Sequence, residues 1–167
     1  MNKGLYIPFL FISLLLLQVF VLNNIWFLGD TNPYLYVAFV IFYPLKKKRY
    51  AFLFLSFLLG LAIDFFSDSG GINAFALLFI AYTRLFFIRI IFKKTEQDYL
   101  LFNLHQEPFG KVFNYVTILI VIHHFILFSL ANFSTQNFLD VLANTLYSSI
   151  FTSVLFFLGT SIIRKKK

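Results

Sequence analysis

Long apolar runs alternate with short polar segments along the whole chain. A run of about 20 apolar residues is long enough to cross the hydrocarbon core of a bilayer as an α-helix. Composition supports this interpretation, because 60% of the 167 residues are hydrophobic and only 13% are charged. A soluble domain of this length could not bury so much apolar surface. The pattern predicts an all-α polytopic membrane protein, a single integral membrane domain whose six transmembrane helices form a bundle at residues 5–22, 33–45, 50–66, 72–92, 112–131 and 138–163.

The segment at residues 33–45 needs separate support, because a helix of this length rises only about 20 Å through a core about 30 Å thick. If all six helices span, the Lys and Arg residues of the loops and termini fall on one side, and the loops around Asp30, Asp68 and Ser134 contain none. The positive-inside rule assigns the basic side to the cytoplasm. We therefore expect both termini in the cytoplasm, with the short second helix helped by local thinning of the bilayer or by residues 25–28 in the interface.

A polar region separates the third and fourth predicted helices. Gly70 and Gly71 follow a serine there and are typical of a turn. Asp64 lies just before them, near the end of the third helix, and an acid within a membrane segment can be an ion or proton site. It can also accept hydrogen bonds from the free amides at the start of the fourth helix, around residues 71–73. We favour this second interpretation, because no other acid lies nearby within a helix.

Arg84 lies twelve residues into the fourth predicted helix. This position is about 18 Å from one helix end and about 12 Å from the other. An arginine that faces lipid at such a depth costs several kcal/mol, so we expect Arg84 to face the bundle interior or a polar groove. Its depth differs from that of Asp64 by about 9 Å in straight antiparallel helices. Separate roles are therefore favoured over a direct ion pair.

Other polar residues occur within the fifth and sixth predicted helices. His123 and His124 are adjacent, and adjacent helical side chains point about 100° apart, which disfavours a shared metal. We expect one of them to make an interhelical hydrogen bond. In the sixth helix Ser149 and Ser153 belong to a row of hydroxyl residues spaced three and four apart. This row predicts a packing face, either within the molecule or toward a partner helix.

The chemistry of an enzyme is not indicated. The chain has no cysteine, and it contains no phosphate-binding glycine loop, zinc-binding His-Glu-x-x-His or nucleophile-elbow motif. We therefore assign no catalytic residue, cofactor or metal. The net charge of +7 does not indicate nucleic acid, because the basic residues flank apolar segments.

The stretch GLAIDFFSDSGGINAFALLFIAYTR, residues 60–84, resembles the rod-shape-determining protein MreD family. The resemblance lies in a Gly-Leu-x-x-Asp helix end, a short turn with glycines, and small and aromatic residues that lead to an arginine. The basic loop before this stretch and the basic C-terminus agree with the topology of that family. The resemblance covers the whole chain in topology, but only this stretch in residues.

The resemblance implies a non-enzymatic, multi-pass subunit of the bacterial inner (cytoplasmic) membrane. It would scaffold or regulate side-wall peptidoglycan synthesis and cell shape within the cell-wall elongation machinery (the elongasome). The implied partners are an MreC-like membrane protein, MreB, RodA and a penicillin-binding transpeptidase, all at the lipid bilayer. The candidate structural and interaction residues are Asp64, Gly70, Gly71 and Arg84 in the stretch that carries the resemblance, together with Ser149 and Ser153 of the hydroxyl row.

The alternative is the vitamin-binding subunit of an energy-coupling-factor transporter, because the MreD fold is similar to that of such subunits. These subunits typically have small residues at four-residue spacing in the first helix, where the transporter scaffold docks. Residues 5–22 of this chain contain neither alanine nor glycine. The first helix therefore counts against the transporter alternative.

Overall fold

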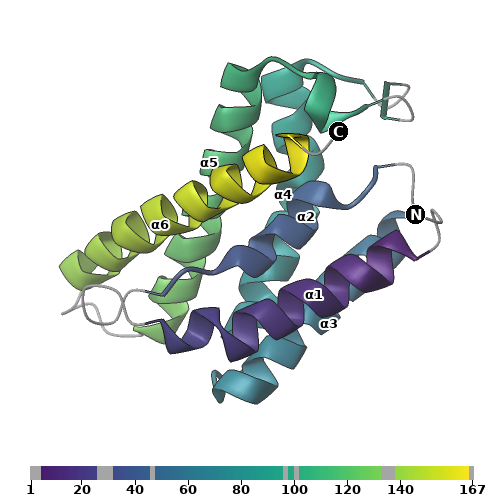
Figure 1. The fold of residues 1–167 in the computed structure, drawn as a ribbon. Helices are drawn as coiled ribbons and strands as arrows, with labels where there is room; N and C mark the ends of the chain where they lie inside the picture. The colour runs from purple at the N-terminus through teal and green to yellow at the C-terminus, as the bar shows by residue number, and fades with distance from the viewer. Residues whose placement is uncertain are drawn as a thin grey trace.

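A computed structural model of the chain describes residues 5–25, 32–45, 48–95, 98–99, 102–132 and 138–165. Those residues form helices, turns and short extended stretches without a strand, which confirms the predicted all-α fold (Figure 1). Five of the helices are long and apolar enough to cross a membrane. They are α1 (Tyr6–Phe20, continued by the 3-10 turn η1 at Leu22–Asn24), α3 (Arg49–Ser67), α4 (Ile72–Phe92), α5 (Phe109–Ala131) and α6 (Phe138–Lys165).

The second apolar segment differs from its prediction. The sequence predicts one helix over residues 33–45, whereas the structure has a 3-10 turn, η2 (Leu35–Val37), followed directly by the short helix α2 (Ala38–Phe42). Tyr43 is extended, with ψ 128°, because the proline that follows it disfavours helical backbone at the preceding residue. Five of the six predicted helices are therefore found as long helices, and the second is found as a shorter and irregular helical segment within its predicted range.

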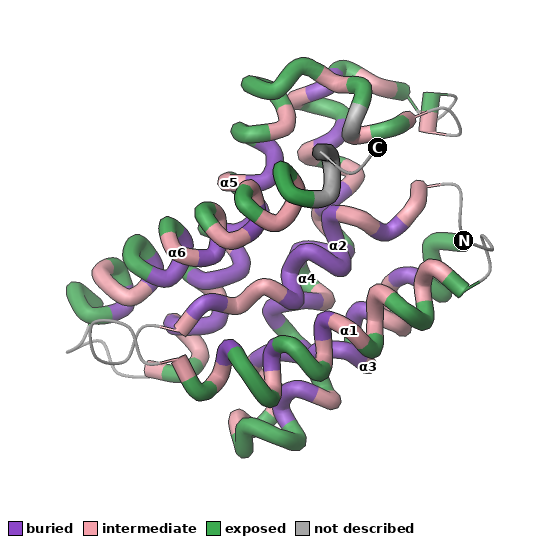
Figure 2. Tube along the Cα trace, in the orientation of Figure 1, coloured by how far each residue is buried: buried purple, intermediate pink, exposed green. Residues whose placement is uncertain are grey.

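This short segment lies inside the bundle, where Figure 2 shows α2 buried between its neighbours. Tyr36, Val37, Phe39 and Val40 are 0% exposed. Irregular backbone is tolerated at membrane depth where protein surrounds it. Contact with the neighbouring helices therefore accommodates this short segment within the bundle. Of the predicted interfacial segment 25–28, only its first residue is among those that the structure describes.

The segment runs antiparallel to α1. At its start, Gln18 near the end of α1 donates to the Pro33 carbonyl at 3.0 Å and accepts from the Leu35 amide at 3.0 Å. At its other end, Tyr43 lines the same cavity as Tyr6 at the start of α1. Successive segments therefore alternate in direction, as predicted, although the side of the membrane that each end faces stays a prediction.

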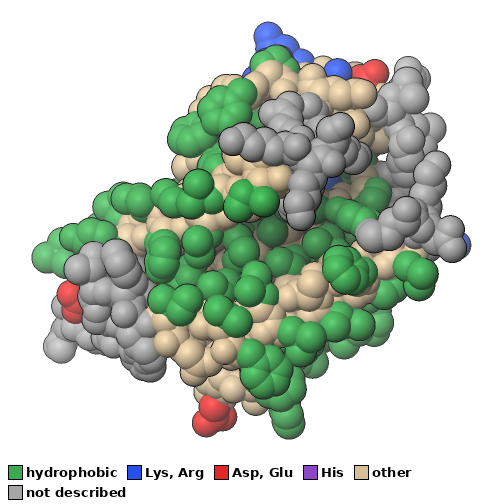
Figure 3. Space-filling model, viewed as in Figure 1, with side chains coloured by type: hydrophobic (Ala, Val, Ile, Leu, Met, Phe, Trp, Pro, Cys, Tyr) green, Lys and Arg blue, Asp and Glu red, His purple; other side chains and the backbone are tan. Residues whose placement is uncertain are grey.

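Charged side chains separate along the bundle. The described lysines lie where α3 and α5 begin and where α4 and α6 end, and we call this the basic end. At the opposite end Asp64, Asp68 and Asp140 lie where α3 ends and α6 begins. Figure 3 shows Lys and Arg side chains at the top of the view, beside an acidic side chain, and at the right edge, whereas acidic side chains alone lie at the bottom and the far left. The positive-inside rule favours a cytoplasmic position for the basic end.

Candidate functional site

Asp64 joins the end of α3 to the start of α4. The residue is 4% exposed, and its carboxylate accepts backbone hydrogen bonds from Asn73 at 2.9 Å and Ala74 at 2.8 Å. These amides belong to the first turn of α4, where no intrahelical acceptor exists and the helix dipole favours a negative charge. The carboxylate also accepts from the Ser69 hydroxyl at 2.6 Å and the Asn73 side-chain amide at 2.9 Å. The predicted capping role is confirmed: the amide of Asn73 lies within the expected range, and that of Ala74 lies one residue beyond it.

A glycine one turn before Asp64 allows the two helices to touch. A Cβ atom added to Gly60 would lie 2.5 Å from the Cα of Ala74 and 2.7 Å from the carbonyl oxygen of Asn73. Such contacts are far inside van der Waals range, so any side chain at Gly60 would push α4 away. Residues four apart share a helix face, which places Gly60 and Asp64 together against the start of α4.

The connection between α3 and α4 uses left-handed backbone. Asp68, Gly70 and Gly71 have φ values of 51°, 65° and 95°. Glycine adopts this region without the steric cost that other residues carry, so the predicted turn at Gly70 and Gly71 is confirmed. The turn is short enough to bring the Asp64 carboxylate back onto the first amides of α4.

The polar cluster at this turn extends into the buried second segment. The Tyr36 hydroxyl donates to the side-chain oxygen of Asn73 at 2.6 Å, and both residues are buried. Asn73 in turn donates to Asp64 and Ser69. The acid therefore sets the orientation of an amide that holds a third segment, η2, in place.

Arg84 is buried in the bundle interior, as predicted, with 3% of its surface exposed. Its Nη2 donates to the backbone carbonyl of Tyr43 at 2.7 Å and makes a longer contact of 3.4 Å with the carbonyl of Ile41. These carbonyls are available because α2 ends there. Arg84 and Asp64 form no ion pair, in agreement with the expectation of separate roles.

The histidine pair divides into one bonded and one unbonded residue. His124 Nδ1 lies 2.7 Å from the Ile120 carbonyl, which can only accept, so Nδ1 carries the proton. Nε2 then accepts from the Thr152 hydroxyl of α6 at 3.1 Å, and the same hydroxyl accepts from the Tyr34 amide at 3.0 Å. The predicted interhelical bond is confirmed for His124, whereas His123 makes none and packs against the Tyr36 ring.

Replacing Thr152 with valine should lower the free energy of unfolding by about 1–2 kcal/mol, a typical size for interhelical hydrogen bonds. Valine keeps the shape of threonine but leaves the Tyr34 amide and His124 Nε2 without a partner. Thr117→Val is the matched control, because the buried Thr117 hydroxyl has no hydrogen-bond partner. The free energies of unfolding of the two purified variants, measured in detergent, test this prediction. Equal stability of the two would mean that the Thr152 bonds contribute nothing.

The hydroxyl row of α6 faces the interior of the molecule. Thr145, Ser148, Ser149 and Thr152 are buried, so this row packs within the bundle, and Ser153 is half-buried at its edge. The hydroxyls of Ser148 and Ser149 have no hydrogen-bond partner. Small hydroxyl residues of this kind are typical of helix contacts in membrane proteins.

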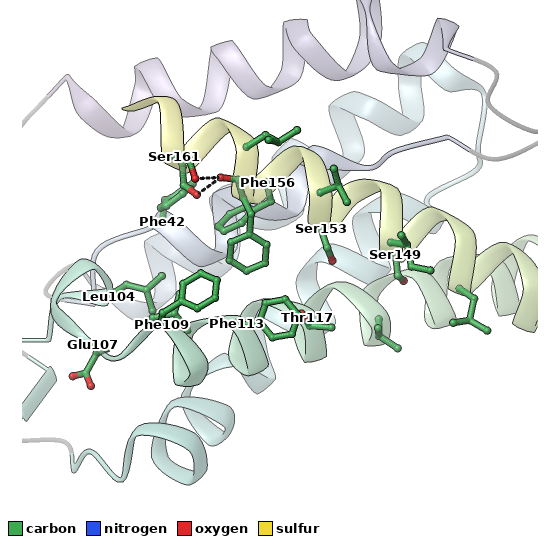
Figure 4. A pocket seen from close by; sticks show the side chains of 18 residues that line it. Phe42, Leu104, Glu107, Phe109, Phe113, Thr117, Ser149, Ser153, Phe156 and Ser161 are labelled. Atoms are coloured by element: carbon green, nitrogen blue, oxygen red, sulfur yellow. Dashed lines mark hydrogen bonds between the residues drawn. The ribbon is translucent and has the colours of Figure 1, made fainter. Parts of the chain in front are cut away.

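An apolar groove opens between α5 and α6, with a volume of about 730 Å³. Phe109, Phe113 and Phe157 line one part, with the Phe113 and Phe157 rings stacked at 5.4 Å. Figure 4 shows Ser149 and Ser153 pointing from α6 toward α5 along the rest of the groove. We call this feature the α5–α6 groove. Its lining can hold an apolar chain or a narrow helix face.

The loop between α4 and α5 is held at the basic end by local bonds. Lys94 and Glu107 form an ion pair at 3.3 Å. The Thr95 amide and hydroxyl both donate to Asp98 at 2.8 Å, and these bonds hold the pKa of that carboxyl below its usual range. Among the residues that the structure describes, no three His, Asp or Glu side chains come together as a metal site.

Sequence reasoning missed several residues of this architecture. Gly60 carried a signal in its spacing of four from Asp64, and Asn73 lay within the range expected to meet the acid. Tyr36 and the carbonyl of Tyr43 carried no such signal, because their roles depend on where the second segment lies. Comparison of the chain with protein-family models, with curated proteins and with solved structures found no match. The resemblance to MreD in residues 60–84 therefore stays a prediction.

Proposed function

We propose that this protein is a non-enzymatic subunit of the bacterial cell-wall elongation machinery in the inner membrane. It scaffolds or regulates side-wall peptidoglycan synthesis and thereby cell shape. The proposal rests on the MreD-like stretch of residues 60–84, which forms the α3–α4 hairpin. In that hairpin Gly60 permits backbone contact, Asp64 caps α4 and Arg84 anchors the end of α2.

The observation that carries the proposal is the use of Asp64 as a structural acceptor. A carboxylate that carries protons or ions needs access to water, and its oxygen lone pairs must not all be engaged in structural hydrogen bonds. Both oxygens of Asp64 instead accept bonds from the start of α4, and the residue is almost fully buried. The stretch that resembles MreD is therefore built to hold helices together, which is the property a scaffold requires.

The proposed partners are an MreC-like membrane protein and, through it, MreB, RodA and a penicillin-binding transpeptidase. Large apolar side chains of α1, among them Phe9, Ile12 and Phe20, are more than half exposed and offer a surface for lateral contact in the bilayer. In this proposal the basic end faces the cytoplasm, where a filament of MreB would lie.

Depletion of the protein in the bacterium that carries it tests the proposal, with cell shape imaged and membrane partners of the tagged protein identified in the same cells. Rounded cells and recovery of an MreC-like protein are the expected results. Normal shape, with a transporter scaffold or a bound vitamin recovered, would contradict them and favour the energy-coupling-factor alternative. Complementation by Asp68→Asn but not by Asp64→Ala would connect the hairpin to the phenotype, provided that both variants reach the membrane in equal amounts.

A further inference from the structure

Arg84 brings a positive charge into the bundle without a carboxylate partner among the residues that the structure describes. Its Nη2 donates hydrogen bonds to two neutral backbone carbonyls. The ring of Phe52 lies 5.1 Å from the guanidinium carbon, which adds a favourable but uncharged contact. Nε and Nη1 have no hydrogen-bond partner, and no described carboxylate pairs with Arg84. The guanidinium is thus oriented by backbone carbonyls, and no acidic residue among those that the structure describes neutralises it.

A buried guanidinium without a carboxylate partner is expected to bind an anion. Removing an ion from water is costly unless a close opposite charge and further hydrogen bonds compensate. The planar fork of arginine matches the geometry of phosphate and carboxylate oxygens. The Tyr115 hydroxyl lies beside the Arg84 guanidinium and interacts with it, but it adds no negative charge while it is protonated. Nε and Nη1 of Arg84 are therefore the donors that remain for an anion.

A cavity of about 230 Å³ adjoins Arg84 at the basic end. A water molecule occupies about 30 Å³ in the liquid, so the cavity has room for a phosphate group. The lysines and arginines at this end attract anions from solution and from the membrane surface. The remaining walls of the cavity are Tyr6, residues 41–45 and residues 102–104.

The cavity and the α5–α6 groove adjoin each other, because Phe42 and Leu104 line both. A polar cavity with an unneutralised cation therefore meets an apolar groove in the same part of the molecule. An amphiphile with an anionic head and an apolar chain has the complementary arrangement.

We propose that Arg84 binds a phosphate oxyanion in this cavity, and that the oxyanion is the headgroup of an anionic membrane lipid whose chain lies in the α5–α6 groove. This assignment does not depend on the function proposed above. A scaffold and a transporter subunit could both carry such a lipid site.

Thermal unfolding of the full chain, purified in a neutral detergent and stripped of lipid, tests the proposal. We expect a saturable rise in Tm with phosphatidylglycerol, because a ligand that binds only the folded state stabilises it. Phosphatidylcholine should give a smaller rise, since its choline cancels the charge. No rise with phosphatidylglycerol would overturn the proposal. An equal rise with inorganic phosphate alone would support the oxyanion cavity and overturn the lipid as its source.

Two arginine variants locate the site. Arg84→Met should raise the phosphatidylglycerol concentration needed for half of the maximal Tm rise by about tenfold or more, because the variant loses a charge-assisted hydrogen bond to the lipid. Arg89→Met is the matched control, because Arg89 is exposed on the same helix, and it should leave half-saturation unchanged. Equal affinity of Arg84→Met and the unaltered protein would overturn the assignment. If Arg84→Met does not fold, Leu104→Glu places a competing carboxylate in the cavity wall and should abolish the rise.

Glu96 belongs to the acidic residues of the loop between α4 and α5 and lies outside the described residues. The Glu96→Gln variant tests whether the Glu96 carboxylate neutralises the Arg84 guanidinium. An unchanged Tm and an unchanged response to phosphatidylglycerol would support an external anion. A loss of Tm as large as that of Arg84→Met, together with loss of the lipid response, would identify an internal ion pair and overturn the proposal.

Discussion

Replacing Asp64 with alanine should lower the free energy of unfolding by about 3 kcal/mol or more, since each buried polar group left unsatisfied costs about 1–3 kcal/mol. The backbone amides of Asn73 and Ala74 would lose their acceptor. The side chain of Asn73 would also be released from its present orientation, and with it the bond to Tyr36. Thermal or denaturant unfolding of the purified protein in detergent measures the loss.

The matched control for this prediction is Asp68→Asn. Asp68 is exposed and lies in the same turn, and asparagine tolerates its left-handed backbone well. We expect little change in stability for this variant, and Asp64→Asn should fall between the two because its amide keeps one acceptor oxygen. If Asp64→Ala were as stable as Asp68→Asn, the capping interaction would contribute nothing to the fold.

A methyl group at position 60 should be the second damaging change. Gly60→Ala should destabilise the protein by about 2–3 kcal/mol, within the range for overpacked interiors. The added Cβ would meet the backbone of Ala74 at 2.5 Å, and backbone cannot move aside as a flexible side chain can. The start of α4 would shift away from α3, and the bonds to Asp64 would lengthen with it.

Gly159→Ala is the control for this prediction, because Gly159 also lies within a long helix but has no atom within 4 Å of an added Cβ. Alanine there should stabilise the helix by about 0.5–1 kcal/mol through its better helix propensity. The two substitutions are chemically identical, so opposite signs of their effects in one unfolding assay would isolate the contact at Gly60. Effects of the same sign would refute the importance of close approach.

The long helices and the capping of α4 by Asp64 could be predicted from sequence because they depend on residues close together in the chain. Apolar runs set the helices, and the spacing of Asp64, Gly70 and Gly71 gives a short turn that returns the acid to the next helix. The predicted start of the fourth helix agrees with α4, which begins at Ile72. The hydrogen bonds then follow from the need of the first helical amides for an acceptor.

The second segment and the surroundings of Arg84 could not be predicted in the same way. Residues 33–45 are apolar enough for lipid, and nothing in their composition distinguishes contact with lipid from contact with other helices. Their conformation depends on Pro44 and on burial by distant parts of the chain. The acceptors of Arg84 are backbone carbonyls of that segment, which have no signature in sequence. The α5–α6 groove arises from the way two helices pack, which is likewise a property of the fold.

The burial of α2 has a consequence for how the protein is made. A five-residue α-helix leaves most of its backbone groups without intrahelical partners, and such groups are costly in hydrocarbon. During synthesis α2 leaves the ribosome before α4 and α6, which later surround it together with α1. We therefore expect α2 to have no stable position in lipid when it first emerges, and to be enclosed only after α4 and α6 have been inserted. The order in which the segments become stable would then differ from their order along the chain.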